Sequence, residues 1–182
     1  MIRLILFGVG SLGILAVSWA SLHHPRSHGF YRFFAFEAIL ALVLMNVPYW
    51  FHRPFSAFQI FSWLLLLASL FLVAHGVRLL RLIGKPQGKV ESSPNLGFEN
   101  TAILVTIGAY RYIRHPLYAS LLYLGWGAFF KDPSILGGIL ALVATAALVA
   151  TARVEERENL QTFGADYAAY MKNTRMFIPF LL

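Results

Sequence analysis

The chain has 182 residues, of which 58% are hydrophobic and only 13% charged, with a formal net charge of +7. Ordinary soluble domains are about 25% charged, and a soluble chain of this length could not remove so much apolar surface from water. The composition therefore indicates one membrane domain over residues 1–182 and excludes a separate soluble domain. The absence of cysteine excludes disulfides, thiolate metal ligands and a cysteine nucleophile.

Apolar runs in chain order predict five membrane spans. Three of them, at residues 4–22, 33–51 and 54–77, account for residues 1–81. The fourth, at residues 116–130, is short, so a re-entrant or interfacial helix is the alternative reading. The fifth is at residues 133–152. Because about 20 apolar residues cross about 30 Å of hydrocarbon, we expect an all-α integral membrane fold with five transmembrane helices.

The distribution of Lys and Arg predicts the orientation. Five spans leave only Arg3, Arg53 and Lys131 of the 15 basic residues on one side. The others lie in the first loop, the loop at residues 82–113 and the C-terminal tail, and they are Arg26, Arg32, Arg78, Arg81, Lys85, Lys89, Arg111, Arg114, Arg153, Arg157, Lys172 and Arg175. The positive-inside rule then places the N-terminus outside and the C-terminus in the cytoplasm, and we expect the inner membrane of a cell. Membrane lipids, rather than nucleic acid, are the expected partners of these basic residues.

Glu37 interrupts the second apolar run, and a carboxylate inside a membrane needs a partner. We expect an ion pair with Arg78, at similar depth on the third span; contact with a polar substrate is the alternative.

Two further patterns have structural explanations. Residues 8–13 match G-x-G-x-x-G, but they lie inside an apolar run and not in a strand–turn–helix unit. They therefore predict close helix packing through small residues. His23, His24 and His28 lack a nearby carboxylate or cysteine, so we expect an interfacial polar loop and no metal site.

Polar and aromatic residues gather at residues 108–118, with the sequence GAYRYIRHPLY, at the entrance to the fourth span. Pro116 can occupy the first turn of a helix, whose free N–H groups can bind an anion, and the rings can attract a cation. An interfacial aromatic and basic belt is the alternative.

The C-terminal tail predicts an amphipathic helix on the inner leaflet, because apolar residues recur at near-helical spacing. They are Val154, Leu160, Phe163, Tyr167 and Tyr170. Glu155 and Glu156 follow the fifth span directly and can therefore approach Arg114 and His115. A salt-bridge cluster that only fixes the tail to the third loop is the alternative.

These two segments resemble the isoprenylcysteine carboxyl methyltransferase family and its wider phospholipid methyltransferase-like relatives. Residues 110–118, YRYIRHPLY, match the family pattern YRYxRHPxY. Glu155 and Glu156 match its paired glutamates, and they are followed by an FGxxYxxY run, an arginine and a proline. The match covers roughly residues 108–179.

The resemblance implies an integral membrane enzyme that transfers a methyl group from S-adenosylmethionine to a lipophilic acceptor, with its active site facing the cytoplasm in residues 114–182. It assigns Glu155, Glu156 and Arg175 to the reaction centre. It assigns the cofactor pocket to Tyr110, Arg114, His115, Tyr118, Tyr167 and Tyr170.

The expected acceptor is a carboxylate of the isoprenylcysteine type, because an arginine such as Arg175 can hold a carboxylate with two hydrogen bonds. A phospholipid or another small or prenylated molecule is the alternative acceptor. A non-catalytic or reductase-like membrane protein of the same architecture is the alternative to a methyltransferase.

Overall fold

The computed structural model describes residues 1–85 and 101–181, and this part of the chain is helical, with one isolated β-bridge. The α-helices are α1 (Ile2–Leu22), α2 (His28–Asn46), α3 (Ala57–Leu82), α4 (Pro116–Phe129) and α5 (Ile135–Asn173). Two 3₁₀ turns, η1 (Val47–Tyr49) and η2 (Gly108–Arg111), follow α2 and precede α4. Lys89 and residues 86–100 of the predicted loop at residues 82–113 lie outside the described residues.

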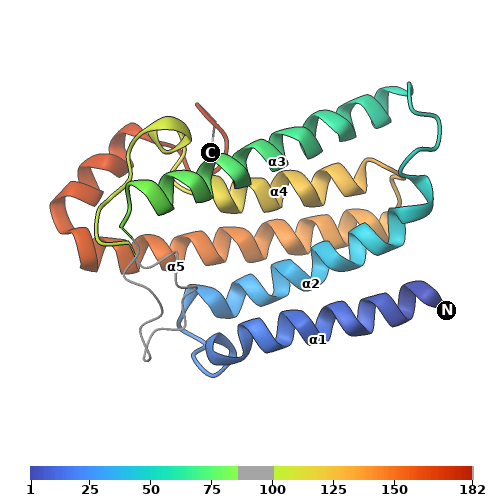
Figure 1. Cartoon of the computed structure of the whole chain (residues 1–182), viewed down its shortest axis with the longest axis horizontal. Coiled ribbons are helices and arrows are strands. Elements are labelled where there is room, and N and C mark those ends of the chain that lie inside the picture. The colour runs from blue at the N-terminus through green and yellow to red at the C-terminus, as the bar shows by residue number, and fades with distance from the viewer. Residues whose placement is uncertain (86–100, 182) are drawn as a thin grey trace.

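Four helices, α1, α2, α3 and α5, are long and apolar enough to cross a membrane. Helix α4 has 14 residues, which span only about 21 Å at 1.5 Å per residue. It nevertheless packs along α3 and against α2 and α5. Consecutive helices run in alternate directions (Figure 1), so α4 makes a pass of its own between the two ends of the bundle. The five-span topology and its orientation stay predictions.

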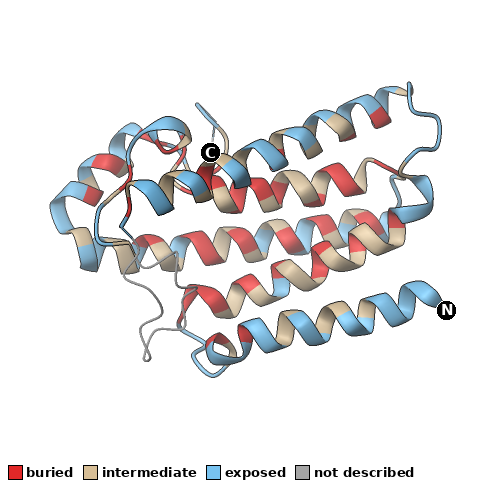
Figure 2. Ribbon diagram, in the orientation of Figure 1, coloured by how far each residue is buried: buried red, intermediate tan, exposed pale blue. Residues whose placement is uncertain are grey.

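The packed core lies between α2, α4 and α5, whereas α1 and the outer face of α3 expose apolar side chains (Figure 2). Ala35, Ala119, Leu148 and Ala152 are fully buried at its centre. Leu64, Leu67 and Leu70 on α3 are at least 60% exposed. Such a surface suits a helix that faces lipid rather than water.

The expected ion pair between Glu37 and Arg78 is not formed. Glu37 Oε2 instead accepts a hydrogen bond of 2.7 Å from the Ser11 hydroxyl of α1, and its Oε1 is buried without a hydrogen-bond partner. The prediction was wrong because similar depth in the membrane does not ensure that two helices present their side chains to each other. Glu37 faces α1, and α3 packs on α4.

The glycine pattern in α1 has the expected role at one of its three positions. A methyl group at Gly10 would lie 2.8 Å from the Leu40 side chain of α2, so the two helices approach closely there. Gly8 and Gly13 have nothing within 4 Å at the same place. Close packing through small residues is therefore confirmed only at Gly10.

His28 differs from the predicted loop histidine. It is the first residue of α2, it is buried, and its Nδ1 lies 2.6 Å from Glu158 Oε2 on α5. His23 and His24, in contrast, contact backbone carbonyls of the last turn of α1 and are exposed. The contact of His28 joins the start of α2 to the segment of α5 that follows the paired glutamates.

Helix α5 continues past the predicted end of the fifth span at residue 152. It is regular up to Gly164, whose φ of 55° and ψ of −125° bend the chain. A residue with a side chain rarely adopts this backbone conformation. The predicted amphipathic tail is therefore the continuation of α5, turned back at one glycine.

Candidate active site

The start of α4 is held by the C-terminal segment of the chain. The backbone N–H of Arg114 donates to the carbonyl of Arg175 at 2.7 Å, and that of His115 donates to Met176 at 3.2 Å. The N–H of Arg175 donates to the carbonyl of Tyr112 at 3.1 Å. Pro116 then opens α4, as the sequence predicts. These bonds fix the direction in which the side chains at positions 114, 115 and 118 leave the backbone.

Arg114 and Glu156 form a buried ion pair, because Arg114 Nε donates to Glu156 Oε1 at 2.7 Å and both side chains are only about a tenth exposed. Arg114 Nη1 also donates to the carbonyls of Thr174, at 2.5 Å, and Met171, at 3.3 Å. The guanidinium group thus already has three acceptors from α5 and the residue that follows it.

The environment of Glu156 keeps its carboxyl group ionised. Burial alone would raise its pKa, but hydrogen bonds and charge from His115 and Arg114 outweigh burial and hold the pKa below its ordinary value. His115 Nε2 lies 3.4 Å from Glu156 Oε1. Glu156 is therefore the anionic centre of a buried cluster and not a free group.

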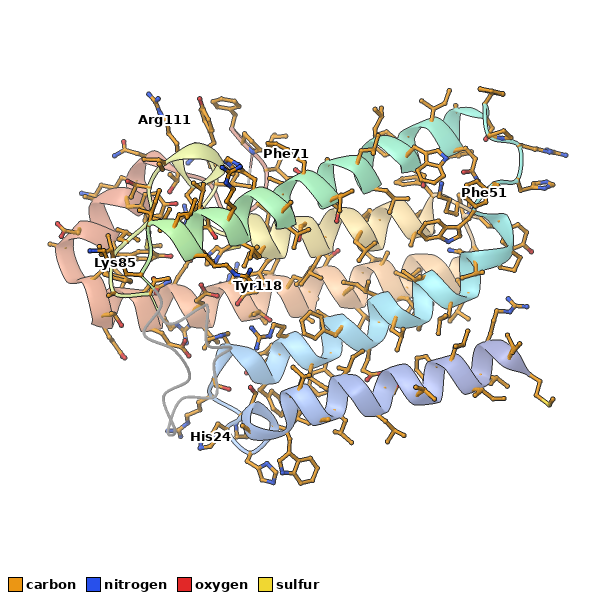
Figure 3. The ribbon with its side chains drawn as sticks, in the orientation of Figure 1. His24, Phe51, Phe71, Lys85, Arg111 and Tyr118 are labelled. Carbon is orange, nitrogen blue, oxygen red and sulfur yellow. The ribbon has the colours of Figure 1, made fainter. Side chains whose placement is uncertain are left out.

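Glu155 has a different environment although it is the next residue. Its side chain is 29% exposed, it lines a cleft, and it accepts a short hydrogen bond from the Tyr118 hydroxyl. The His115 ring stacks on Tyr118 at 5.5 Å between centroids, and its Nδ1 lies 3.8 Å from Glu155 Oε1. Figure 3 shows Tyr118 where α4 faces α5. Glu155 thus presents a carboxylate to the cleft from a fixed position.

Two tyrosines of α5 that follow Gly164 cover this cluster. Tyr167 and Tyr170 are buried, with ring centroids 5.8 Å apart, and the Tyr170 hydroxyl donates to the carbonyl of Tyr110 at 2.5 Å. Burial raises the pKa of both hydroxyl groups well above the ordinary value, so both stay protonated. A hydrogen bond with Asn159 acts against this shift at Tyr167. Tyr167 and Tyr170 therefore form an uncharged aromatic cover.

The cleft encloses about 620 Å³ of empty space, which includes space open to the surroundings. Seven of the nine predicted site residues line it, and they are Tyr110, Arg114, His115, Tyr118, Glu155, Tyr167 and Tyr170. Glu156 lies directly behind Arg114 and His115.

Arg175 is the predicted site residue that the structure places apart. Its backbone holds the corner before α4, but its side chain is exposed and lines a second cavity with Tyr112 and Lys172. Its predicted place at the reaction centre stays a prediction.

Several lining residues are not among those predicted. Asn159 extends the polar wall one helical turn after Glu155, a spacing that could have identified it. The apolar wall comes from α3, α4 and the segment between them, and it consists of Leu80, Thr101, Leu104, Val105, Leu117 and the nearby Phe163 of α5. Phe163 belongs to the FGxxYxxY run, but no sequence motif marks the other residues of this wall.

The donor set fits an organic ligand rather than a metal ion. Residues 1–85 and 101–181 contain no cluster of three His, Asp or Glu side chains that could hold a metal. The cleft instead combines a carboxylate, an amide, several electron-rich rings and one apolar wall.

Fold and site together define a helical bundle with four helices able to cross a membrane and an aromatic, acidic cleft at one end. No protein-family model and no solved structure matches the chain.

The chain is similar to curated proteins named methanethiol S-methyltransferase. It is 30% identical to the one from Pseudomonas deceptionensis over 125 residues, which are 66% of this chain and 43% of that protein. It is 29% identical to the one from Crocosphaera subtropica over 127 residues, covering 66% and 44%. Methanethiol S-methyltransferase 1 from Bradyrhizobium diazoefficiens is 28% identical over 126 residues, covering 65% and 39%. The chain spans less than half the length of these relatives.

Proposed function

We propose that the chain is a membrane methyltransferase that uses S-adenosylmethionine to methylate a small lipophilic acceptor at the cleft beside Glu155. The observation that carries the proposal is that the two adjacent glutamates have different contacts. The Glu156 carboxylate contacts Arg114 and His115, whereas Glu155 lines the cleft. The names of the similar proteins give independent support for methyl transfer.

The residues of the cleft suit the methyl donor. S-adenosylmethionine supplies an electrophilic methyl group on a sulfonium, together with an amino group, a carboxylate and an adenosine. Electron-rich rings such as Tyr118 and Tyr167 attract a cation, and Glu155 can pair with a positive charge. The apolar wall at Leu104 and Leu117 suits a flat or lipophilic group. The aromatic cover would exclude water, which leaves alignment as the main task of the protein.

The charges of the cleft favour an acceptor that is not a carboxylate. Arg114 is the only Lys or Arg among its described lining residues, and its guanidinium already contacts Glu156 and two carbonyl groups. A carboxylate acceptor would also lie near Glu155 and be repelled. We therefore favour an uncharged thiol, the class named for the similar proteins, over the isoprenylcysteine carboxylate.

Glu155 would take the proton that a thiol must lose. The donor would supply the methyl group to the acceptor sulfur and leave as a neutral thioether, and a Glu155 oxygen would accept the thiol proton. Tyr118, which donates to the other oxygen, orients the carboxylate for this transfer.

The first test is calorimetric titration of folded, detergent-solubilised protein with S-adenosylhomocysteine, with NADPH as the control ligand. Saturable binding of S-adenosylhomocysteine alone supports the proposal. Binding of NADPH alone would indicate a reductase, and binding of neither would leave a non-catalytic protein.

The second test offers methanethiol or a prenylcysteine with a free carboxylate as the acceptor and measures methylated product. Glu155→Gln should lower turnover with the thiol at least tenfold, which is about 1.4 kcal/mol of barrier. Arg53→Gln, at the other end of the bundle, is the control variant. Methylation of the carboxylate alone would refute the thiol assignment and leave methyl transfer standing.

A further inference from the structure

A second open cavity, of about 690 Å³, lies outside the methyl-transfer cleft. Its lining residues are Tyr112, Lys172, Asn173, Arg175, Pro179 and Phe180. Its described lining residues thus supply two cationic groups, a phenol and an amide, and none of them is acidic.

The two cations of this cavity are free to bind. Among the described residues, neither Lys172 nor Arg175 forms an ion pair. Arg114, in contrast, already contacts Glu156 and two carbonyl groups. An Arg guanidinium and a Lys ammonium that line the same cavity can both donate hydrogen bonds to a phosphate group.

The cavity lies at the level where the membrane-crossing part of α4 begins. Residues 113–115 pair with residues 175–176, and α4 starts at Pro116. The C-terminal segment therefore returns beside the first turn of α4, as Figure 1 shows. This end of the bundle is also the one that carries most of the basic residues, where lipid headgroups are anionic.

Apolar and aromatic side chains border the cations on the surface. Phe180 and Leu181 are 85% and 77% exposed, and Tyr112 is 52% exposed. Phe180 has a φ of 68°, a left-handed conformation that is strained in a residue with a side chain. In water the exposed apolar side chains do not stabilise this segment. In a bilayer, Phe180 and Leu181 can enter the acyl region while Tyr112 stays at the interface.

We propose that this cavity binds the headgroup of an anionic phospholipid. Lys172 and Arg175 contact the phosphate, Tyr112 and Asn173 donate to its oxygens or to the glycerol, and Phe180 and Leu181 lie along the acyl chains. The lipid would fasten the C-terminal segment, and hence the corner at Arg114, to the membrane surface.

The test measures binding of fluorescent phosphatidylglycerol to the detergent-solubilised full chain, with phosphatidylcholine of the same acyl composition for comparison. Phosphatidylglycerol should bind saturably, with one tight site per chain. The double variant Lys172→Gln/Arg175→Gln should weaken it by about 100-fold, tenfold for each lost charge-assisted contact, which is about 1.4 kcal/mol each.

The double variant Arg153→Gln/Arg157→Gln is the matched control, since it removes the same charge from exposed positions that follow the fifth span on α5. Equal weakening in both double variants would show general attraction to basic residues and overturn the proposal, as would equal affinity for the two lipids. If millimolar inorganic phosphate abolishes lipid binding, the cavity is a site for free phosphate and the proposal is overturned. Thermal melting checks that each variant is folded; if the first double variant is not, Lys172→Glu alone should still weaken binding of phosphatidylglycerol and leave that of phosphatidylcholine unchanged.

Discussion

Replacing Glu156 by glutamine tests the buried cluster at the site. Removing one partner of a buried ion pair costs about 3–5 kcal/mol. Glutamine keeps an oxygen that can accept from Arg114, and the guanidinium keeps two carbonyl acceptors, so we expect a loss of about 2–3 kcal/mol, below that range. At about 2–4 °C for each kcal/mol in a chain of this size, the variant should melt about 4–12 °C lower than the wild type at pH 7.

The neighbouring variant Glu155→Gln is the control. Its carboxylate is 29% exposed and has no ion pair with an arginine, so its loss should cost less than about 1 kcal/mol. Melting followed by tryptophan fluorescence in detergent measures both. The same fall in melting temperature for the two variants would refute the distinction between a buried structural glutamate and one that serves the cleft.

The pH dependence gives a second check on Glu156. Its pKa is lower in the folded protein than its ordinary value of 4.5, so the unfolded chain binds a proton first as the pH falls. The stabilisation is complete above the ordinary pKa and is lost as the pH falls through the lower, folded-state pKa. The difference in melting temperature between wild type and Glu156→Gln should therefore shrink below pH 4.5. A difference in melting temperature that stays constant down to a pH at which Glu156 is fully protonated would contradict this account.

Three further variants test the cleft, its cover and the membrane carboxylate. Tyr118→Phe removes the hydroxyl that holds Glu155 but keeps the ring, so turnover should fall about tenfold or more with little change in melting; unchanged turnover would argue against orientation of Glu155. Gly164→Ala forces a side chain into a φ of 55° and should cost about 1–3 kcal/mol and weaken binding of S-adenosylhomocysteine, whereas Gly13→Ala, which also meets no neighbour, should be harmless. Glu37→Gln should preserve or raise the melting temperature, because a half-satisfied carboxylate is replaced by a neutral group; a large loss would show that the charge is needed.

The sequence predicts the helices well because a membrane leaves so few alternatives. Long apolar runs must form helices if their backbone is to be satisfied in lipid, and Pro116 and Gly164 mark a helix start and a bend by their own backbone limits. Pairings between helices are harder to predict. Glu37 and Arg78 share a depth but not a facing direction, and only the packed bundle shows that Glu37 faces Ser11.

In the cleft, the polar residues could be predicted from the sequence and most of the apolar residues could not. Its polar wall follows recognisable motifs, so seven of the nine predicted residues line it. Its apolar wall depends on how the end of α3 meets the segment at residues 101–107, which no local pattern encodes. Arg175 follows the motif as well, yet its side chain direction is set by the β-bridge to Ile113, which turns it outward.

The different roles of Glu155 and Glu156 follow from the packing of α5, and the sequence contains the signal. Consecutive residues on a helix point about 100° apart, so the two carboxylates cannot share one environment. Small or apolar residues recur along α5 at positions 141, 144, 148 and 152, and all four are buried. Position 156 continues this stripe at the next turn, and Glu156 is buried as well. The stripe that fixes the rotation of α5 against the bundle thus places Glu156 against Arg114 and leaves Glu155 to face the cleft.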